Sequence, residues 1–146
     1  MIKQFRSVAV TVTPFIKENK PDLEEIALQT AKFGESGIDA IFPCASTGEY
    51  VKMSAEDKCD ILKTVAVNNK GKKALVAGAC AASAGEAKIY IETAKKYNYD
   101  ACVVCPPYYF PQSQSDIFEF YKEISNLAEG MPIIAYHVPF FTSGIE

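Results

Sequence analysis

The chain has 146 residues, of which 49% are hydrophobic and 23% charged, and its formal net charge is −3. This composition is typical of one globular domain, and the acidic balance offers no basic surface for nucleic acid. No stretch approaches the ~18 apolar residues of a membrane span, and residues 1–10 lack the apolar segment and cleavage site of a signal peptide.

Two hydrophobic periods alternate along the chain. Apolar residues at helical spacing predict helices over residues 21–37, 54–71, 83–97 and 115–130. Short apolar and β-branched runs predict strands within residues 7–15, 38–44, 73–80, 99–107 and 131–139. Two helices are expected to begin with a capping box, one formed by Ser54 with Asp57 and the other by Ser83 with Glu86.

The order of these elements, β-α-β-α-β-α-β-α-β, is that of an α/β protein with a parallel sheet. The strands are continuous apolar runs, as expected when both faces of a sheet are covered. Two architectures fit, an open doubly wound sheet and part of a (β/α)8 TIM barrel. No G-x-G-x-x-G follows the first strand, which disfavours a dinucleotide-binding domain. Because a complete barrel needs eight strands and about 250 residues, we interpret residues 1–146 as the N-terminal portion of a single barrel domain. Such a five-stranded sheet should carry open edges.

The cysteines predict reduced thiols in a cytoplasmic protein, because they are an odd set without the framework of a small disulfide-rich domain. Cys102 and Cys105 form a C-x-x-C pair inside a predicted strand, where residues three apart point to opposite faces. The chain also has a single histidine, so a zinc site would lack ligands. We interpret the pair as packing residues and expect no metal site.

In both architectures the functional residues lie at the carboxyl ends of the strands. After the second predicted strand, the segment CASTGEY carries the hydroxyl groups of Ser46 and Thr47, followed by Gly48. Glycine permits the positive φ of a tight turn, and successive amides in such a turn form a concave site suited to a carboxylate. The alternative is an ordinary turn without a ligand.

Tyr136 lies near the end of the fifth predicted strand. It either packs with its hydroxyl group satisfied or, as a phenol with a lowered pKa, transfers protons, and spacing alone leaves both open. His137 should point to the opposite face of a regular strand, where it would pack or support the site.

These segments together resemble a family of pyruvate-dependent class I aldolases that includes dihydrodipicolinate synthase and N-acetylneuraminate lyase. CASTGEY is similar to the G-[ST]-T-G-E loop of that family, PPYYFP to its P-[YF]-Y-x-[KP] segment, and AYHVP to its Y-N-[IV]-P strand end. VTPF in the first predicted strand also fits. Each motif alone is weak, but their order and spacing agree over essentially the whole chain.

The resemblance implies a (β/α)8 barrel and carbon–carbon lyase chemistry, with a sixth-strand lysine that forms a Schiff base with pyruvate or a related 2-keto acid. It implies that Ser46, Thr47 and Gly48 bind the keto-acid carboxylate and that Tyr136, Tyr109 and Ser46 relay protons. Tyr109 matches a tyrosine that crosses a dimer interface in the synthase branch, so a homodimer or homotetramer is implied. No metal or organic cofactor is implied, because the lysine imine is the electron sink. The alternative is that Tyr108 and Tyr109 are only interface or surface aromatics.

The chain also departs from the family pattern. It ends before the strand that carries the Schiff-base lysine, and its own lysines fall on predicted helices, on their approaches or before a strand. Phe140 and Phe141 stand where the synthase has an arginine that binds a second carboxylate, and phenylalanine cannot form that clamp. These differences favour an aldolase or lyase acting on a sugar acid over a dihydrodipicolinate synthase. The rival interpretation is a catalytically inactive truncated or half-barrel module that binds a small carboxylate or only assembles.

Overall fold

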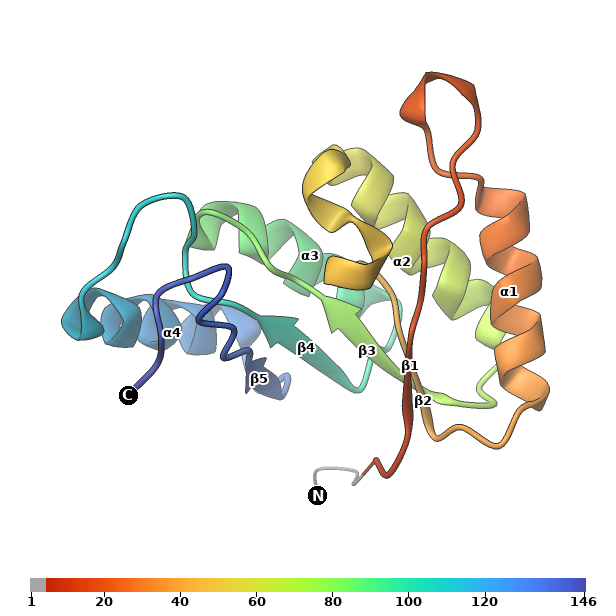
Figure 1. The fold of residues 1–146 in the computed structure, drawn as a ribbon. Helices are drawn as coiled ribbons and strands as arrows, with labels where there is room; N and C mark the ends of the chain where they lie inside the picture. Colours follow the sequence, from red (N-terminus) through yellow and green to blue (C-terminus); the bar gives the residue numbers. More distant parts are fainter. Residues whose placement is uncertain (1–4) are drawn as a thin grey trace.

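The computed structural model describes residues 5–146. For Glu18 it describes the backbone only. A parallel sheet lies against a layer of α-helices (Figure 1). The strands are β1 (Val8–Val10), β2 (Ala40–Phe42), β3 (Ala74–Gly78), β4 (Ala101–Val104) and β5 (Ile133–Ala135). The α-helices are α1 (Leu23–Glu35), α2 (Ala55–Asn69), α3 (Ala84–Lys96) and α4 (Gln114–Ala128), and the 3-10 helices are η1 (Lys17–Asn19), η2 (Ser46–Gly48) and η3 (Tyr50–Lys52).

The order of the strands decides between the two predicted architectures. They pair in sequence order, β1-β2-β3-β4-β5, and each neighbouring pair is parallel. A doubly wound sheet reverses its strand order and carries helices on both faces, whereas here the helices cover one face (Figure 1). The chain therefore has the arrangement of successive βα units of a (β/α)8 barrel. Within the described residues β1 and β5 are open edges, which confirms that prediction.

The main core lies between the sheet and the helices. Alternate strand residues such as Ile41, Leu75 and Cys102 point to this side and join one cluster with the helices. The predicted apolar faces of α2, α3 and α4 are buried in it. None of the helices in residues 5–146 is long and apolar enough to cross a membrane.

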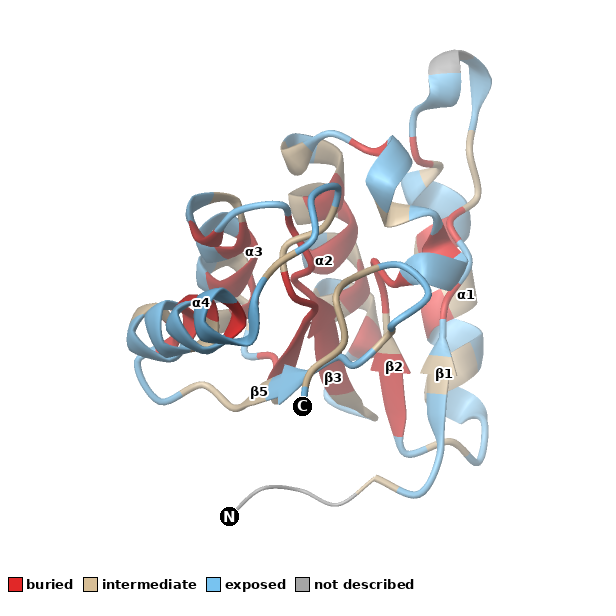
Figure 2. Cartoon of the chain, turned by 60° about the vertical axis from the view of Figure 1, so that its left-hand side comes forward, coloured by how far each residue is buried: buried red, intermediate tan, exposed pale blue. Residues whose placement is uncertain are grey.

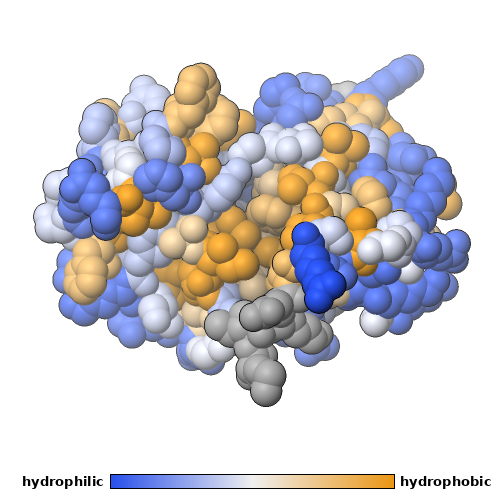
Figure 3. Space-filling view, turned by 60° about the horizontal axis from the view of Figure 1, so that its bottom comes forward, coloured by the Kyte–Doolittle hydropathy of each residue, from blue (hydrophilic) through white to orange (hydrophobic). Residues whose placement is uncertain are grey.

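The face of the sheet that points away from the helices is apolar but unevenly covered. At its centre Val76 and Val103 are buried, whereas at the edges Val10 and Ile134 are 41% and 42% exposed. Figure 2 shows the same gradient, with β3 buried and β5 exposed. Seen from below, apolar side chains lie across the middle of the surface between hydrophilic margins (Figure 3). The prediction that both faces are covered is therefore wrong at the edges of this sheet, where no second layer of the described residues lies.

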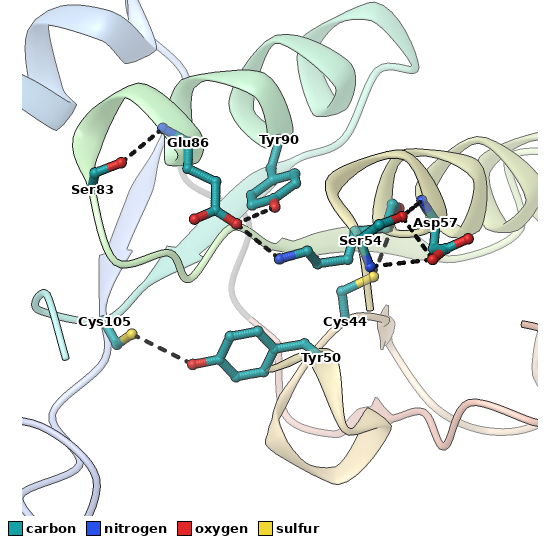
Figure 4. Close-up of polar contacts among 9 residues, drawn as sticks. Cys44, Tyr50, Ser54, Asp57, Ser83, Glu86, Tyr90 and Cys105 are labelled. Atoms are coloured by element: carbon teal, nitrogen blue, oxygen red, sulfur yellow. Dashed lines mark hydrogen bonds and ion pairs between the residues drawn. The ribbon is translucent and has the colours of Figure 1, made fainter. Parts of the chain in front are cut away.

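Side-chain caps start the helices, with two corrections to the prediction. The capping box of Ser54 and Asp57 forms in both directions, as predicted. At α3 only half of the predicted box forms, because Ser83 accepts from the Glu86 amide while the Glu86 carboxylate turns to Lys58 and Tyr90 (Figure 4). The predicted start of the fourth helix at residue 115 is too late, since Ser113 caps it in a box with Asp116.

Gly78, at the end of β3, packs directly on the chain that leaves β2. A Cβ atom at this position would lie 2.1 Å from the Cys44 carbonyl oxygen and 2.8 Å from that of Pro43. The Gly78 amide also donates to the Pro43 oxygen at 3.0 Å. This close approach holds the ends of β2 and β3 together at the edge where the functional residues are expected.

We expect Gly78→Ala to lower the free energy of unfolding by about 2–3 kcal/mol, because the added methyl group meets backbone atoms that cannot turn away. Gly85→Ala is the matched control, since a Cβ on this exposed α3 residue meets nothing within 4 Å and alanine stabilises a helix by roughly 0.5–1 kcal/mol. Urea unfolding measures both. Equal stability of the two variants would contradict the close approach.

Candidate active site

The loop after β2 forms the short helix η2 around the predicted carboxylate-binding residues. The Gly48 amide donates to the Ala45 oxygen at 2.9 Å and the Glu49 amide to the Ser46 oxygen at 3.0 Å. Ser46 and Thr47 are exposed, and no described residue accepts a hydrogen bond from their two amides. Two successive amides and two hydroxyl groups are therefore available to an anion at the carboxyl end of the sheet.

Gly48 does not have the positive φ that the sequence predicted. The positive φ expected there is found instead at Glu49, with φ 57°, and at Cys44, with φ 59°. Gly48 is buried, and a Cβ on it would lie 3.0 Å from both the Thr11 oxygen and Thr13 Oγ1. The Thr13 hydroxyl donates to the Gly48 oxygen at 2.8 Å. Glycine is thus required for close packing, which ties the loop to the segment that follows β1.

Tyr136 follows β5 directly and is held by the neighbouring strand, since its amide donates to the Val104 oxygen at 2.9 Å. Its side chain is 36% exposed and lines a cavity described below. His137 does not line this cavity, and its Nδ1 accepts from the Ile145 amide at 3.0 Å. The two side chains therefore have different surroundings, as predicted for neighbours on an extended segment.

The paired tyrosines after β4 occupy different environments. Tyr108 is half-buried and packs edge-on against Tyr50, with ring centroids 6.3 Å apart. Tyr109 is 88% exposed and has φ 87°, a backbone conformation that is uncommon for residues other than glycine. Its ring contacts only the neighbouring Phe110 among the aromatic pairs of residues 5–146. The strained backbone thus holds Tyr109 outward while Tyr108 turns inward.

A cavity of about 300 Å³ brings the predicted residues together at the carboxyl ends of β2, β4 and β5. Ser46, Tyr109 and Tyr136 line it, whereas Thr47 and Gly48 do not. Tyr108 and Phe141, which the sequence analysis placed next to the site, also line the cavity. The sequence interpretation missed the remaining lining residues, which are Tyr50, Val51, Cys105, Val138 and Thr142. Position after a strand was a signal for most of them, but the inward turn of each side chain was not visible in the sequence.

No lysine, arginine, aspartate or glutamate of residues 5–146 lines the cavity, so its polar groups are tyrosine phenols, the Cys105 thiol and the hydroxyl groups of Ser46 and Thr142. Tyr50 lies at its inner wall, with its hydroxyl group 3.9 Å from Cys105 Sγ (Figure 4). Burial raises the pKa of Tyr50, so this phenol stays protonated. Residues 5–146 contain no cluster of three or more histidine, cysteine or acidic side chains that could hold a metal ion.

A buried ion pair lies behind this wall. Lys58 of α2 is 4% exposed, and its Nζ lies 3.1 Å from Glu86 Oε1 and 4.4 Å from the centre of the Tyr90 ring. The Tyr90 hydroxyl donates to the same carboxylate at 2.5 Å (Figure 4). Partial burial raises the pKa of Glu86, but the Tyr90 hydrogen bond and the Lys58 cation outweigh it, so this pKa lies below its ordinary value. The most buried lysine among residues 5–146 therefore forms a structural pair between α2 and α3.

A model of the dihydrodipicolinate synthetase family matches residues 3–144. The chain belongs to this family. The chain is 31% identical to the N-acetylneuraminate lyase of Citrobacter koseri and 34% identical to the 4-hydroxy-tetrahydrodipicolinate synthase of Anaeromyxobacter dehalogenans. These matches cover 95% and 94% of the chain but 47% and 46% of the two relatives, so this family member spans about half of their length.

Solved structures of the dihydrodipicolinate synthetase type agree with the fold. The N-acetylneuraminate lyase of Mycoplasma synoviae superposes with a TM-score of 0.84 at 32% identity, over 92% of this chain and 47% of the lyase. The 2-keto 3-deoxygluconate aldolase of Picrophilus torridus gives a TM-score of 0.84 at 28% identity, over 94% of this chain and 49% of the aldolase. The described sheet and helices therefore correspond to about half of a family barrel.

We expect Lys58→Met to lower the free energy of unfolding at neutral pH by about 2–3 kcal/mol, because it leaves the partly buried Glu86 carboxylate without its cation. The difference from the unchanged protein should shrink in acid. Since the folded pKa of Glu86 is lowered, its contribution is present above the ordinary value of 4.5 and is lost as the pH falls through the folded value. Thermal or urea unfolding across pH measures both effects.

Lys122→Met is the control, since Lys122 pairs with Glu119 on the exposed surface of α4, where an ion pair contributes about 0–1 kcal/mol. A loss for Lys58→Met no larger than for Lys122→Met would show that the buried pair does not stabilise this edge of the fold.

Proposed function

We propose that this chain supplies the carboxylate-binding and proton-relay part of the active site of a pyruvate-dependent, Schiff-base-forming carbon–carbon lyase. The observation that carries the proposal is the cavity lined by Ser46, Tyr109 and Tyr136. These residues come from three separate segments, and each segment resembles a motif of the family. Family membership supports the reaction class.

In this proposal the carboxylate of a 2-keto acid binds the free amides of Ser46 and Thr47 and their hydroxyl groups. Such a site suits an anion because charge-assisted hydrogen bonds to backbone amides are short and strong. Ser46 joins this loop to the cavity that Tyr136 also lines, so the bound acid extends past Ser46 to Tyr136, which passes protons to and from the carbinolamine and the substrate. The aromatic wall of Tyr50 and Tyr108 keeps the reacting groups away from bulk water.

The Schiff-base lysine must come from a segment other than residues 5–146, because no described lysine lines the cavity. Lys58 cannot take the role, since its amine is held by Glu86 and Tyr90. A deprotonated amine in a desolvated pocket is needed for imine formation. When formed, that imine is the electron sink for bond cleavage, so the proposal requires no metal or organic cofactor.

For the substrate, we favour a sugar acid over the substrates of a dihydrodipicolinate synthase. The only arginine of the sequence is Arg6, which precedes β1 and so lies at the amino end of the strands. Phe141 lines the cavity where a carboxylate clamp was expected for the synthase. An apolar wall at this position suits the carbon chain of a substrate that has one carboxylate.

We further propose a cytoplasmic homodimer or homotetramer in which Tyr109 reaches the site of a second subunit. The exposure of Tyr109 and the strained backbone of this residue support the proposed assembly. Backbone strain of this kind is found mainly at functional sites. The alternative is a catalytically inactive module that binds a small carboxylate. The free amides of the η2 loop would bind the carboxylate equally well in such a module.

Trapping with pyruvate and borohydride tests the enzyme proposal. The 146-residue chain should show no covalent adduct in its intact mass, whereas a longer protein that carries this sequence and a complete barrel should take up one reduced pyruvate. Tyr136→Phe in that longer protein should slow trapping about 100-fold or more, because proton relay by a side chain contributes at least that factor.

Tyr97→Phe is the matched control, since Tyr97 lies at the end of α3 away from the cavity, and it should leave the rate unchanged. An adduct on a lysine within residues 5–146 would overturn the assignment of the lysine. A complete barrel that takes up no pyruvate adduct would favour the inactive module.

A further inference from the structure

Cys105, which lines the cavity, has a second cysteine, Cys80, beside it on the neighbouring segment. β3 and β4 pair with Val76 opposite Ala101 and Gly78 opposite Val103. Continued by two residues, this register places Cys80 opposite Cys105. Both belong to the cluster on the sheet face that points away from the helices, and the Cys105 amide lies 3.2 Å from Cys80 Sγ, to which it donates.

The backbone separation that this register implies suits a covalent bond between the thiols. Neighbouring strands of a sheet lie about 4.8 Å apart, and disulfides join Cα atoms that are roughly 4.4–6.8 Å apart. Cys102, the other half of the C-x-x-C motif, points instead to the helices, where its Sγ lies 3.2 Å from Met131 Sδ. The pair that the fold creates is therefore different from the pair that is adjacent in sequence.

The surroundings make Cys105 the more acidic of the two thiols. The neighbouring Cys80 thiol, aided by the Tyr50 hydroxyl, outweighs the effect of burial and lowers the pKa of Cys105. The same neighbourhood and burial raise the pKa of Cys80, whose thiol donates to the Val103 oxygen at 3.7 Å. By contrast, burial raises the pKa of Cys44 and of Cys102 to about 12 each. Since the thiolate is the nucleophile, Cys105 is the thiol that should react first.

Access to the pair is through the cavity. Cys105 lines it, and its volume of about 300 Å³ admits a small molecule, since one water occupies roughly 30 Å³. Among residues 5–146 no acidic side chain lines the cavity to disfavour a thiolate. The resolving sulfur of Cys80 already lies 3.2 Å from the Cys105 amide nitrogen.

We propose that Cys80 and Cys105 are a modification site, a dithiol that a small hydroperoxide oxidises to a disulfide across β3 and β4. The Cys105 thiolate attacks the outer oxygen of the peroxide, the O–O bond breaks, and the leaving alkoxide or hydroxide takes up a proton. Cys80 sulfur, losing its proton, then attacks the sulfenic acid and displaces water. The two thiols lose two electrons in total, and the peroxide is reduced to an alcohol and water, or to water alone for hydrogen peroxide.

Brief treatment with hydrogen peroxide, followed by mass spectrometry under non-reducing conditions, tests this proposal. The protein should become lighter by two hydrogen atoms, lose two of its five thiols and recover both with dithiothreitol. Trypsin places Cys80 in peptide 74–88, where it is the sole cysteine, and Cys102 and Cys105 in peptide 97–122. The two peptides should be linked, and fragmentation between Val103 and Val104 should assign the bond to Cys105.

Variants separate this reaction from general oxidation. Cys105→Ser should abolish the linked peptides, and Cys59→Ser should retain them, since Cys59 lies on α2 and bonds with Thr93 away from the pair. The proposal is overturned if the linked cysteine is Cys102, if other cysteines link first, or if Cys105 is oxidised to sulfinic acid while Cys80 stays free. The peptide map of the unchanged protein decides these outcomes even where a variant fails to fold.

Discussion

The parallel register of the sheet is the constraint on which the rest of this structure depends. Because the strands run side by side in sequence order, every segment that leaves a strand does so at the same edge. The Ser46 loop, the tyrosine pair and Tyr136 therefore meet around one cavity although they are far apart in the chain. Gly78 allows the ends of β2 and β3 to approach at backbone distance, and the register also sets Cys80 opposite Cys105.

The two faces of the sheet have different roles, one in stability and one in the candidate site. On the helix side, the core and the Lys58–Glu86–Tyr90 contacts fix α2 and α3 and thereby support the loops above them. On the other side, apolar side chains surround a cavity whose polar groups are phenols, the Cys105 thiol and the hydroxyl groups of Ser46 and Thr142, with the η2 loop at its edge. Because few charged side chains lie here, backbone amides are the groups available to bind a carboxylate. Tyrosine hydroxyl groups are those available to transfer protons.

The hydrophobic periods were enough to locate each helix and strand, and the position of residues after strands was enough to place Ser46 and Tyr136 at one edge. The choice between a barrel and a doubly wound sheet required the strand order, which the hydrophobic periodicity of a sequence does not specify. Contacts that depend on strand register or on side-chain rotation could not be predicted from the sequence either. The inward turn of Tyr108 onto Tyr50, the Cys80–Cys105 contact and the use of Glu86 by Lys58 instead of its own helix cap are of this kind.

Binding of a 2-keto-acid carboxylate by the η2 loop is central to the proposed function, and titration of the ¹⁵N-labelled protein with pyruvate tests it directly. We predict saturable shifts of the Ser46 and Thr47 amide resonances, with the Gly85 amide on exposed α3 unchanged and with acetone, which lacks the carboxylate, causing little shift. Shifts that cluster away from this loop, or none at pyruvate concentrations that saturate a weak site, would contradict the account.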